Sequence, residues 1–314
     1  MEEKILYSME SPFQQEINVK GYYFGKNEGK ERSACIVGAL RGNEYQQLYI
    51  CSKLIDVLKK IEKHGDMVGE NGILVIPSVN NMSMDFGKRF WISDDTDLNR
   101  LFPGNPSGES GSRVAYAIME TTRGYRYGIH LPSFYLGGTF MPHIRLLDPE
   151  HGSTSLANLF GLPYVIEAKS RPFDRTTLHN NWQRNGTEAF SLYTGMTGKI
   201  DDELATQAVS SILRFLTRMG IIRYYSHSGY IASVLKESDL EPIMTEAAGI
   251  FIRKAECGQE VSRGDVLAQI MKADSGEIIS EVTAPTDGII FYAETRPVVY
   301  TNLLVFKIIK RIHL

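Results

Sequence analysis

Cysteine is scarce in this chain of 314 residues, with Cys35, Cys51 and Cys257 as its three cysteines. None of them forms a Cys-x-x-Cys pair, which excludes a disulfide framework and the paired-thiol zinc and redox sites. The N-terminus also lacks the basic segment and apolar run that an export signal needs. We therefore expect a reducing compartment and predict a cytoplasmic location.

An excess of positive charge and a long apolar run are lacking as well. Lys and Arg number 34 and Asp and Glu number 37, so the net charge is −3. This balance provides no basic field for a phosphate backbone, and we expect no nucleic-acid partner. No segment reaches the roughly 20 apolar residues that cross a bilayer, and we expect no membrane insertion either.

Strand-like and helix-like segments alternate over the first two thirds of the chain. Residues 33–40 and 72–79 are short apolar runs typical of buried strands. Residues 44–62 between them carry apolar side chains at three- and four-residue spacing, as an amphipathic helix does. This order predicts parallel strands covered on both faces, hence an α/β fold, and a further helix over 200–219 closes it.

Glycine-containing turns punctuate the remaining segment, where short β-like runs predict a small antiparallel all-β unit. We therefore predict two domains, residues 1–225 and 226–314. The run Gly258–Asp265 resembles the barrel-sandwich folds of biotinyl and lipoyl carriers. Carrier function would need an exposed hairpin lysine, for which Lys272 is the nearest candidate. A packing or lid role is the expectation.

The turn Gly-Ala-Leu-Arg-Gly-Asn-Glu at residues 38–44 follows the first buried strand and opens a helix. It thus lies at the carboxyl end of a parallel strand, where ligands bind in open α/β sheets. Glu44 by itself would also suit a helix cap or a partner of the helix dipole. The position at the strand end favours a ligand-binding site, but a glutamate there is equally compatible with a helix-capping role.

A second polar segment, residues 89–104, carries Arg89, Asn99 and Arg100 around a Pro-Gly turn. Arginine forks bind a carboxylate or phosphate through two parallel hydrogen bonds, so two arginines with an asparagine supply several donors for one anion. The alternative is a surface loop whose arginines pair with its own aspartates. Two interpretations suit the polar and aromatic residues 180–183, a pocket lining and an exposed loop, and we expect the loop. His179 is expected to be structural or solvated.

The motifs GALRGNE, DDTDLNRLFPG and YGIHLPSF stand in the order found in a known family, followed by a helix and a β domain. The chain resembles, over about residues 30–310, the succinylglutamate desuccinylase/aspartoacylase family of zinc-dependent amidohydrolases, relatives of the zinc carboxypeptidases. The resemblance implies a carboxypeptidase-like α/β/α sandwich with a mixed, largely parallel sheet and a small C-terminal barrel-sandwich-like domain. It also implies hydrolysis of an amide or ester bond in an acylated amino acid or a similar carboxylate substrate.

The metal ligands implied by the resemblance match this chain unevenly. The family's His-Gly-Asn-Glu supplies a His and a Glu to zinc; here Arg41 stands at the His position and Glu44 remains. A guanidinium cannot lose its proton in a protein, so Arg41 cannot be a metal ligand. The family's Asp-Leu-His triplet corresponds to residues 128–130, where His130 remains a candidate ligand and Gly128 replaces the Asp.

A third zinc ligand is not fixed by the motifs, and His143 and Glu167 are the candidates that we keep open. The family's general-base glutamate corresponds to Tyr193. A phenol with a pKa of about 10 donates a hydrogen bond to an oxyanion but is a poor base for water. Arg41 and Tyr193 therefore occupy catalytic positions with altered chemistry.

Arg89, Asn99 and Arg100 fall on the family's carboxylate-binding positions, so both hypotheses that follow take a small-molecule carboxylate as partner. The first is a zinc-dependent hydrolase in which Glu44 and His130 bind the ion. The second is a catalytically silent carboxylate-binding protein in which Arg41 replaces the metal as a fixed positive charge. The acyl group, the amino acid and the oligomeric state, a homo-oligomer included, are left open by the sequence.

Overall fold

The computed structural model describes residues 1–10, 14, 16–26, 32–134, 137–148 and 154–311. The chain divides into two compact units. The first comprises Met1–Ser133, Pro142–Tyr193 and Thr197–Val234. The second comprises Phe134–Met141, Thr194–Met196 and Leu235–Leu314, and therefore takes two short segments from within the span of the first.

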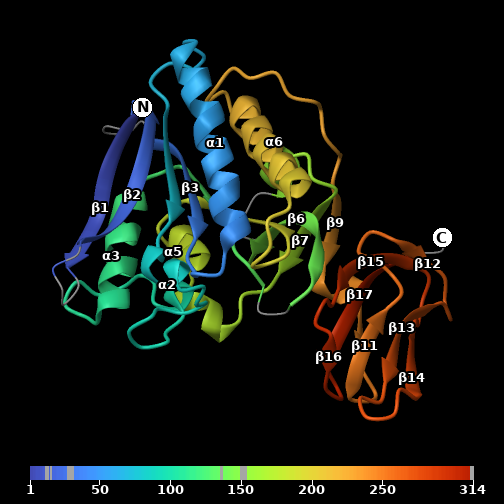
Figure 1. Ribbon diagram of the computed structural model, residues 1–314. Coiled ribbons are helices and arrows are strands. Elements are labelled where there is room, and N and C mark those ends of the chain that lie inside the picture. The colour runs from blue at the N-terminus through green and yellow to red at the C-terminus, as the bar shows by residue number, and fades with distance from the viewer. Residues whose placement is uncertain (11–13, 15, 27–31, 135–136, 149–153, 312–314) are drawn as a thin grey trace. The chain divides into compact units, whose positions relative to one another are not determined.

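A mixed sheet forms the centre of the first unit, with neighbouring strands in the order β1-β2-β4-β3-β5-β8-β6 and β7 beside β6 (Figure 1). The pairs β3/β4, β3/β5, β5/β8 and β6/β7 are parallel, whereas β2 pairs antiparallel with both β1 and β4. The strands are β1 (Glu2–Glu10), β2 (Glu16–Gly25), β3 (Arg32–Ala39), β4 (Gly72–Ser78), β5 (Tyr127–His130), β6 (Thr139–Leu147), β7 (Tyr164–Ala168) and β8 (Glu188–Gly195). The predicted largely parallel α/β sheet is confirmed.

Helices cover both faces of this sheet, and β3 shows why. Ala34 and Ile36 face one core with α1 and α6, while Cys35 and Val37 face another with α3 and α5. Strand side chains alternate between faces, so a fully apolar strand must be covered twice. The helical elements are α1 (Tyr45–Lys63), α2 (Asn81–Asp85), η1 (Leu98–Arg100), α3 (Ser110–Thr122), α4 (Thr154–Asn158), η2 (Pro172–Thr176), α5 (Leu178–Arg184) and α6 (Asp202–Arg218).

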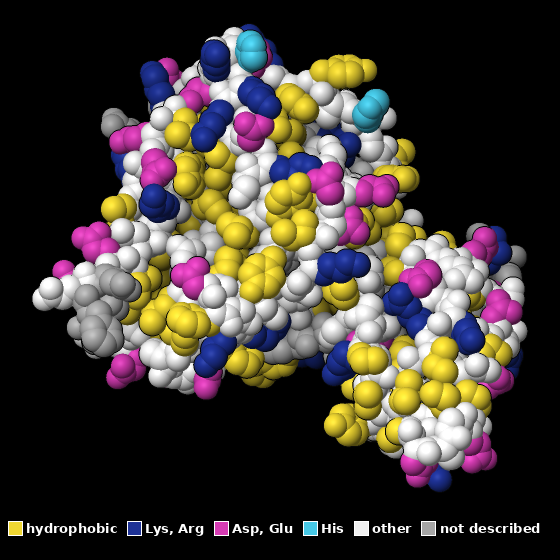
Figure 2. All heavy atoms as spheres, in the orientation of Figure 1, with side chains coloured by type: hydrophobic (Ala, Val, Ile, Leu, Met, Phe, Trp, Pro, Cys, Tyr) yellow, Lys and Arg dark blue, Asp and Glu magenta, His cyan; other side chains and the backbone are white. Residues whose placement is uncertain are grey.

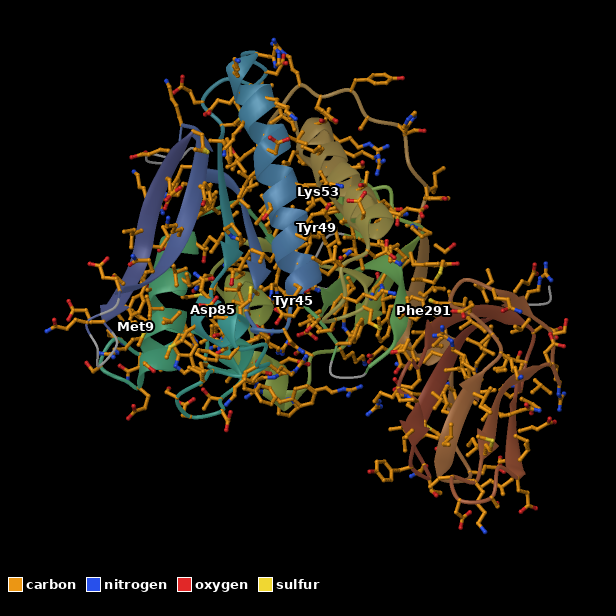
Figure 3. All side chains as sticks on the ribbon, viewed as in Figure 1. Met9, Tyr45, Tyr49, Lys53, Asp85 and Phe291 are labelled. Carbon is orange, nitrogen blue, oxygen red and sulfur yellow. The ribbon has the colours of Figure 1, made fainter. Side chains whose placement is uncertain are left out.

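Polar contacts join α1 to α6 where both helices meet solvent. Tyr49 and Lys53 lie along one side of α1 (Figure 3), and both donate to the Asp202 carboxylate at 2.6 Å. Asp201 caps α6 by accepting the Leu204 N–H, as acidic side chains do at helix N-termini. The start of α6 is thus fixed both by its own cap and by α1.

The second unit consists mainly of β-strands, and the pairings of β10 to β17 are antiparallel, as predicted from the turns. One sheet has the order β14-β13-β11-β16, and β15, β17 and β10 are neighbours in another. A separate apolar core includes Leu267, Ile270 and Phe306. The elements are β9 (Ser233–Lys236), η3 (Glu237–Asp239), β10 (Leu240–Met244), β11 (Gly249–Arg253), β12 (Glu260–Val261), β13 (Val266–Met271), β14 (Ile278–Thr283), β15 (Gly288–Ala293), β16 (Val298–Val299) and β17 (Leu304–Lys310).

Charges of both signs are interspersed over the visible face of the first unit, without a broad region of either sign (Figure 2). This distribution agrees with the nearly balanced composition of the chain. Among the described helices, none is long and apolar enough to span a membrane.

Candidate functional site

The turn that follows β3 buries a glutamate whose carboxylate is fully engaged. Glu44 has no exposed surface and precedes α1 directly. Its Oε2 accepts the backbone N–H groups of Leu40 at 2.8 Å and Arg41 at 3.0 Å. Its Oε1 accepts the N–H and the hydroxyl of Ser133, and Arg41 Nη1 donates to it at 3.2 Å. Hydrogen-bond donors therefore surround both oxygens of this buried carboxylate.

Arg41 lies between two carboxylates and is 2% exposed. Its Nε and Nη2 donate to the two oxygens of Asp97 at 3.0 and 2.9 Å, while Nη1 reaches Glu44. Burial by itself lowers the pKa of Arg41, but the negative charges of Glu44 and Asp97 outweigh burial and raise it. The guanidinium is therefore a permanent cation that joins the β3 turn to η1.

His130 ends β5, the strand next to β3, and is 1% exposed. Its Nε2 has no hydrogen-bond partner among the described residues. Burial lowers the pKa of His130 well below its ordinary value, and the charges of Arg41 and His179 lower it further. A neutral imidazole with an available nitrogen thus lies in the electrostatic field of Arg41.

His179 acts on the same imidazole, since its charge contributes to the lowered pKa of His130. Nothing in the sequence around His179 predicted this. It lies on α5, is 2% exposed, and its Nδ1 is 2.8 Å from the Ser191 hydroxyl on β8. Burial lowers its pKa to about 3. The expected exposed loop over residues 180–183 is wrong, because α5 packs Trp182 into the core. Spacing within the polar stretch gave no signal of this helix.

The zinc ligands implied by the family pattern do not fit an ion in this arrangement. Arg41 replaces one ligand and donates to Glu44, the second, and a guanidinium beside that carboxylate opposes a dication there. In the described part of the chain, no three His, Cys, Asp or Glu side chains are grouped to hold a metal, whereas catalytic zinc generally has three protein ligands. Zinc binding through Glu44 and His130 stays a prediction.

The two candidates for a third ligand have other contacts. His143 on β6 is buried, and its ring lies parallel to that of Tyr193 with centroids 5.1 Å apart. Glu167 on β7 accepts a hydrogen bond from the Thr154 hydroxyl at 2.7 Å. Burial raises the pKa of Tyr193, so this phenol keeps its proton at neutral pH and remains a hydrogen-bond donor.

Gly128, which stands where the resemblance implies an aspartate, has no room for a side chain in this structure. A Cβ built at this position would lie 2.5 Å from the Trp182 ring. Trp182 is fully buried and its indole N–H donates to the Thr122 hydroxyl at 2.9 Å. The indole therefore fills the volume that a side chain at residue 128 would need.

The three predicted carboxylate-binding residues divide into two groups. Arg89 is half-buried, and its Nη1 lies 3.5 Å from Ser133 Oγ, beside the Glu44–Arg41 pair. Asn99 instead accepts the Leu178 N–H at 3.1 Å, at the start of α5. Arg100 donates to the Phe173 carbonyl at 2.9 Å, and its nearest Asp174 oxygen is 3.4 Å away. Arg89 thus reaches the Arg41 cluster, whereas Asn99 and Arg100 hold η1 against η2 and α5.

Comparison with known proteins supplies the family. Residues 30–219 match the model of the succinylglutamate desuccinylase/aspartoacylase catalytic domain. The chain belongs to this family. The N-alpha-acetyl-L-2,4-diaminobutyric acid deacetylase of Halomonas elongata is 24% identical over 292 residues, covering 83% of this chain and 77% of the relative. The family resemblance inferred from the sequence motifs is thereby confirmed, and its named members are deacylases.

Solved structures of the succinylglutamate desuccinylase/aspartoacylase family share the fold. The family protein from Rhodobacter sphaeroides superposes with a TM-score of 0.80 at 18% identity, covering 98% of this chain and 95% of that one. The product-bound ectoine utilization protein from Ruegeria pomeroyi gives a TM-score of 0.79 at 18% identity, with coverages of 96% and 92%. These likenesses confirm the predicted fold over almost the full chain.

Proposed function

We propose that this member of the deacylase family is a catalytically silent carboxylate-binding protein in which Arg41 takes the place of the metal. The observation that supports the proposal is the buried bridge from Arg41 to Glu44 and Asp97, with side-chain exposures of 3%, 0% and 11%. A buried ion pair is costly to open, because removal of one partner leaves the other charge desolvated. The bridge therefore stabilises a site without metal.

Arg41 acts here mainly as an internal counter-charge. Three of its nitrogens already donate to carboxylates, and Nη1 also lies 3.4 Å from the Ser133 carbonyl. Few of its five N–H donors are left for a ligand. Arg89, half-buried beside Ser133, is the better group to bind the ligand's carboxylate, and a fork-to-carboxylate pair suits an acylated amino acid.

The phenol of Tyr193 is a poor base for activating water, which also supports binding without turnover. Tyr193 stands at the position of the family's base, and burial raises its pKa further above neutrality. A group that keeps its proton cannot accept one from water. Tyr193 remains able to donate a hydrogen bond to a bound carbonyl oxygen.

Zinc-dependent hydrolysis of an amide or ester is the second candidate. It is favoured by family membership, by the retention of Glu44 and by the Nε2 of His130, which has no hydrogen-bond partner in the described part of the chain. The cytoplasmic location, the small-molecule carboxylate partner and homo-oligomer formation stay predictions under both candidates.

Elemental analysis and a panel of N-acyl amino acids separate the two functions. Under our proposal, protein purified without chelators holds less than about a tenth of an equivalent of zinc and binds panel members saturably without releasing product. Arg89→Ala should weaken binding at least about tenfold, as loss of a charge-assisted pair predicts, whereas Arg113→Ala, an exposed arginine of α3, should not. Stoichiometric zinc with turnover that Glu44→Gln abolishes would establish the hydrolase instead.

A double replacement tests which residues cause the proposed lack of catalytic activity. Arg41→His with Tyr193→Glu restores the family's residue types at the two altered positions. If those positions alone silenced the site, the variant should gain zinc and measurable hydrolysis relative to the parent chain. No gain would show that further changes, such as Trp182 packed over Gly128, also contribute.

A further inference from the structure

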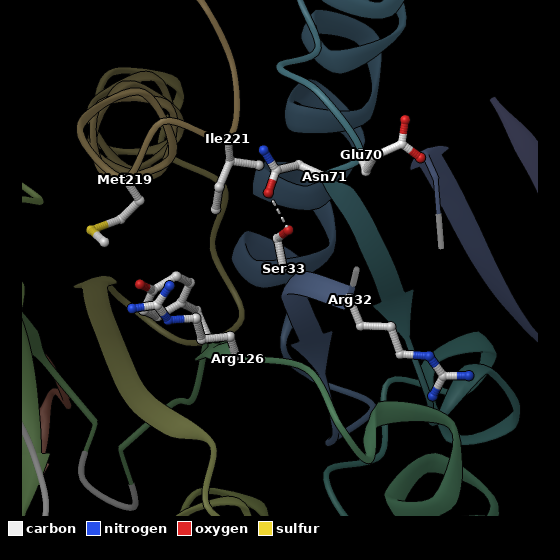
Figure 4. Close-up of a pocket in the computed structure, with 8 residues that line it drawn as sticks. Arg32, Ser33, Glu70, Asn71, Arg126, Met219 and Ile221 are labelled. Atoms are coloured by element: carbon white, nitrogen blue, oxygen red, sulfur yellow. Dashed lines mark hydrogen bonds between the residues drawn. The ribbon is translucent and has the colours of Figure 1, made fainter. Parts of the chain in front are cut away.

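A cavity of about 250 Å³ opens at the amino ends of β3 and β5 (Figure 4). Ser33 and Tyr127, which line it, begin these strands, whereas Arg41 lies beyond the opposite end of β3. Eight residues at about 3.3 Å each separate the two places by roughly 25 Å. The cavity is therefore distinct from the site that contains Arg41.

A buried hydroxyl without a partner and a cation meet in this cavity. Tyr127 is 2% exposed, and its hydroxyl has no hydrogen-bond partner among the described residues. Buried hydroxyl groups are almost always hydrogen-bonded in folded proteins. The guanidinium of Arg126 lies 5.0 Å from the centre of the Tyr127 ring, and no described carboxylate forms an ion pair with it. The Tyr127 hydroxyl and the Arg126 guanidinium are therefore donors that a ligand with an acceptor could bind.

The opposite wall is fixed and partly apolar. The Ser33 hydroxyl donates to the side-chain oxygen Oδ1 of Asn71 at 2.6 Å, and the Asn71 Nδ2 donates to the backbone carbonyl of Val68 at 2.6 Å. Met219 and Ile221 add apolar surface. In Figure 4 the side chains of Ser33, Asn71, Ile221, Met219 and Arg126 border a common space, whereas Arg32 and Glu70 extend away from it.

Nearby carboxylates limit the charge of the ligand that fits. Glu70 is paired with Lys26, so its charge is compensated. Glu188 lies directly opposite Tyr127 in the β5/β8 register, and its Oε2 is buried without a hydrogen-bond partner among the described residues. Glu188 repels any anion in the cavity and repels a dianion more strongly, so a ligand with one negative charge, offset by the Arg126 guanidinium, is favoured over one with two.

We propose that this cavity binds a small monocarboxylate with a short apolar chain. The carboxylate accepts hydrogen bonds from the Arg126 guanidinium and the Tyr127 hydroxyl, a pairing stronger than one between neutral groups. The apolar chain packs against Met219 and Ile221. This binding site is independent of the function proposed for the Arg41 region.

Met219 provides a local probe of the cavity. Butyrate is titrated at constant ionic strength into the full chain labelled with ¹³C at methionine methyl groups, and Met219→Leu assigns the Met219 signal. The signal should shift and saturate. Arg126→Gln should weaken butyrate at least about tenfold, and Tyr127→Phe at least about threefold, because each removes a donor to the carboxylate while the ring of residue 127 is kept.

Matched controls make the experiment decisive. Arg113→Gln and Arg89→Ala should leave the Met219 titration unchanged, since neither residue lines the cavity. Inorganic phosphate at the same ionic strength should shift the signal much less than butyrate. The proposal would be overturned if butyrate does not shift the Met219 signal, or if it shifts that signal equally well in Arg126→Gln. It would also be overturned if phosphate shifts the signal as strongly as butyrate, or if Arg89→Ala abolishes the butyrate-induced shift.

Discussion

The arginines near the two ends of β3 differ in burial and in ion pairing. At the carboxyl end, Arg41 is buried between Glu44 and Asp97. At the amino end, Arg126 is exposed, lies over the Tyr127 ring and has no ion pair among the described residues. A guanidinium whose donors are used within the protein stabilises the fold, whereas one with available donors can bind a ligand.

Arg41→Met should produce the largest difference between the two ends. The substitution leaves the buried Glu44 and the partly buried Asp97 without their counter-charge, which should lower the free energy of unfolding by about 3–5 kcal/mol. Urea unfolding followed by circular dichroism measures the change, with Arg113→Met as the exposed control. A loss below about 1 kcal/mol would mean that the bridge contributes little.

Gly128→Ala tests the packing of Trp182 against Gly128. The added methyl group would lie 2.5 Å from the Trp182 ring, so we expect a loss of about 1–3 kcal/mol in the free energy of unfolding. Combining it with Trp182→Phe should restore part of that loss relative to Trp182→Phe alone. Equal penalties in both backgrounds would show that the indole is not the obstacle.

His179→Asn should flatten the acid dependence of stability. The folded His179 has a pKa of about 3, below its ordinary value of 6.5, so the unfolded chain binds more protons between these pH values. Stability therefore falls on acidification through this window, by roughly 2 kcal/mol from pH 7 to pH 5 for one such histidine. Urea unfolding at several pH values should show a correspondingly shallower slope in the variant, with His64→Asn on the exposed end of α1 as control. Unchanged slopes in His179→Asn would contradict the burial argument.

Arg126→Gln should have the smallest effect on stability. Its exposed side chain has no ion pair to lose among the described residues, so the free energy of unfolding should change by less than about 0.5 kcal/mol. A thermal or urea melt without added carboxylate measures this. A larger loss would mean that Arg126, like Arg41, has a structural role, and would erase the contrast between the two ends of β3.

Local patterns predicted much of the fold. The apolar run at 33–40 and the amphipathic run at 44–62 correspond to β3 and α1, and the glycine-rich turns correspond to the antiparallel second unit. These signals are strong because burial imposes a period of two on strands and 3.6 on helices. The short helix α5 was missed, because its polar side chains contact β8 and β6, and such contacts give no local period.

Residue identities alone determined the family and the chemical types at its key positions: an arginine that cannot bind metal, a retained glutamate and a phenol in place of a base. Tertiary structure decided which groups those residues contact. Arg41 meets Asp97 across 56 residues of sequence, and Trp182 fills the volume beside Gly128. The physical reason is that charge pairing and packing act over a few ångströms in space, so side chains distant along the sequence determine whether a guanidinium serves the fold or a ligand.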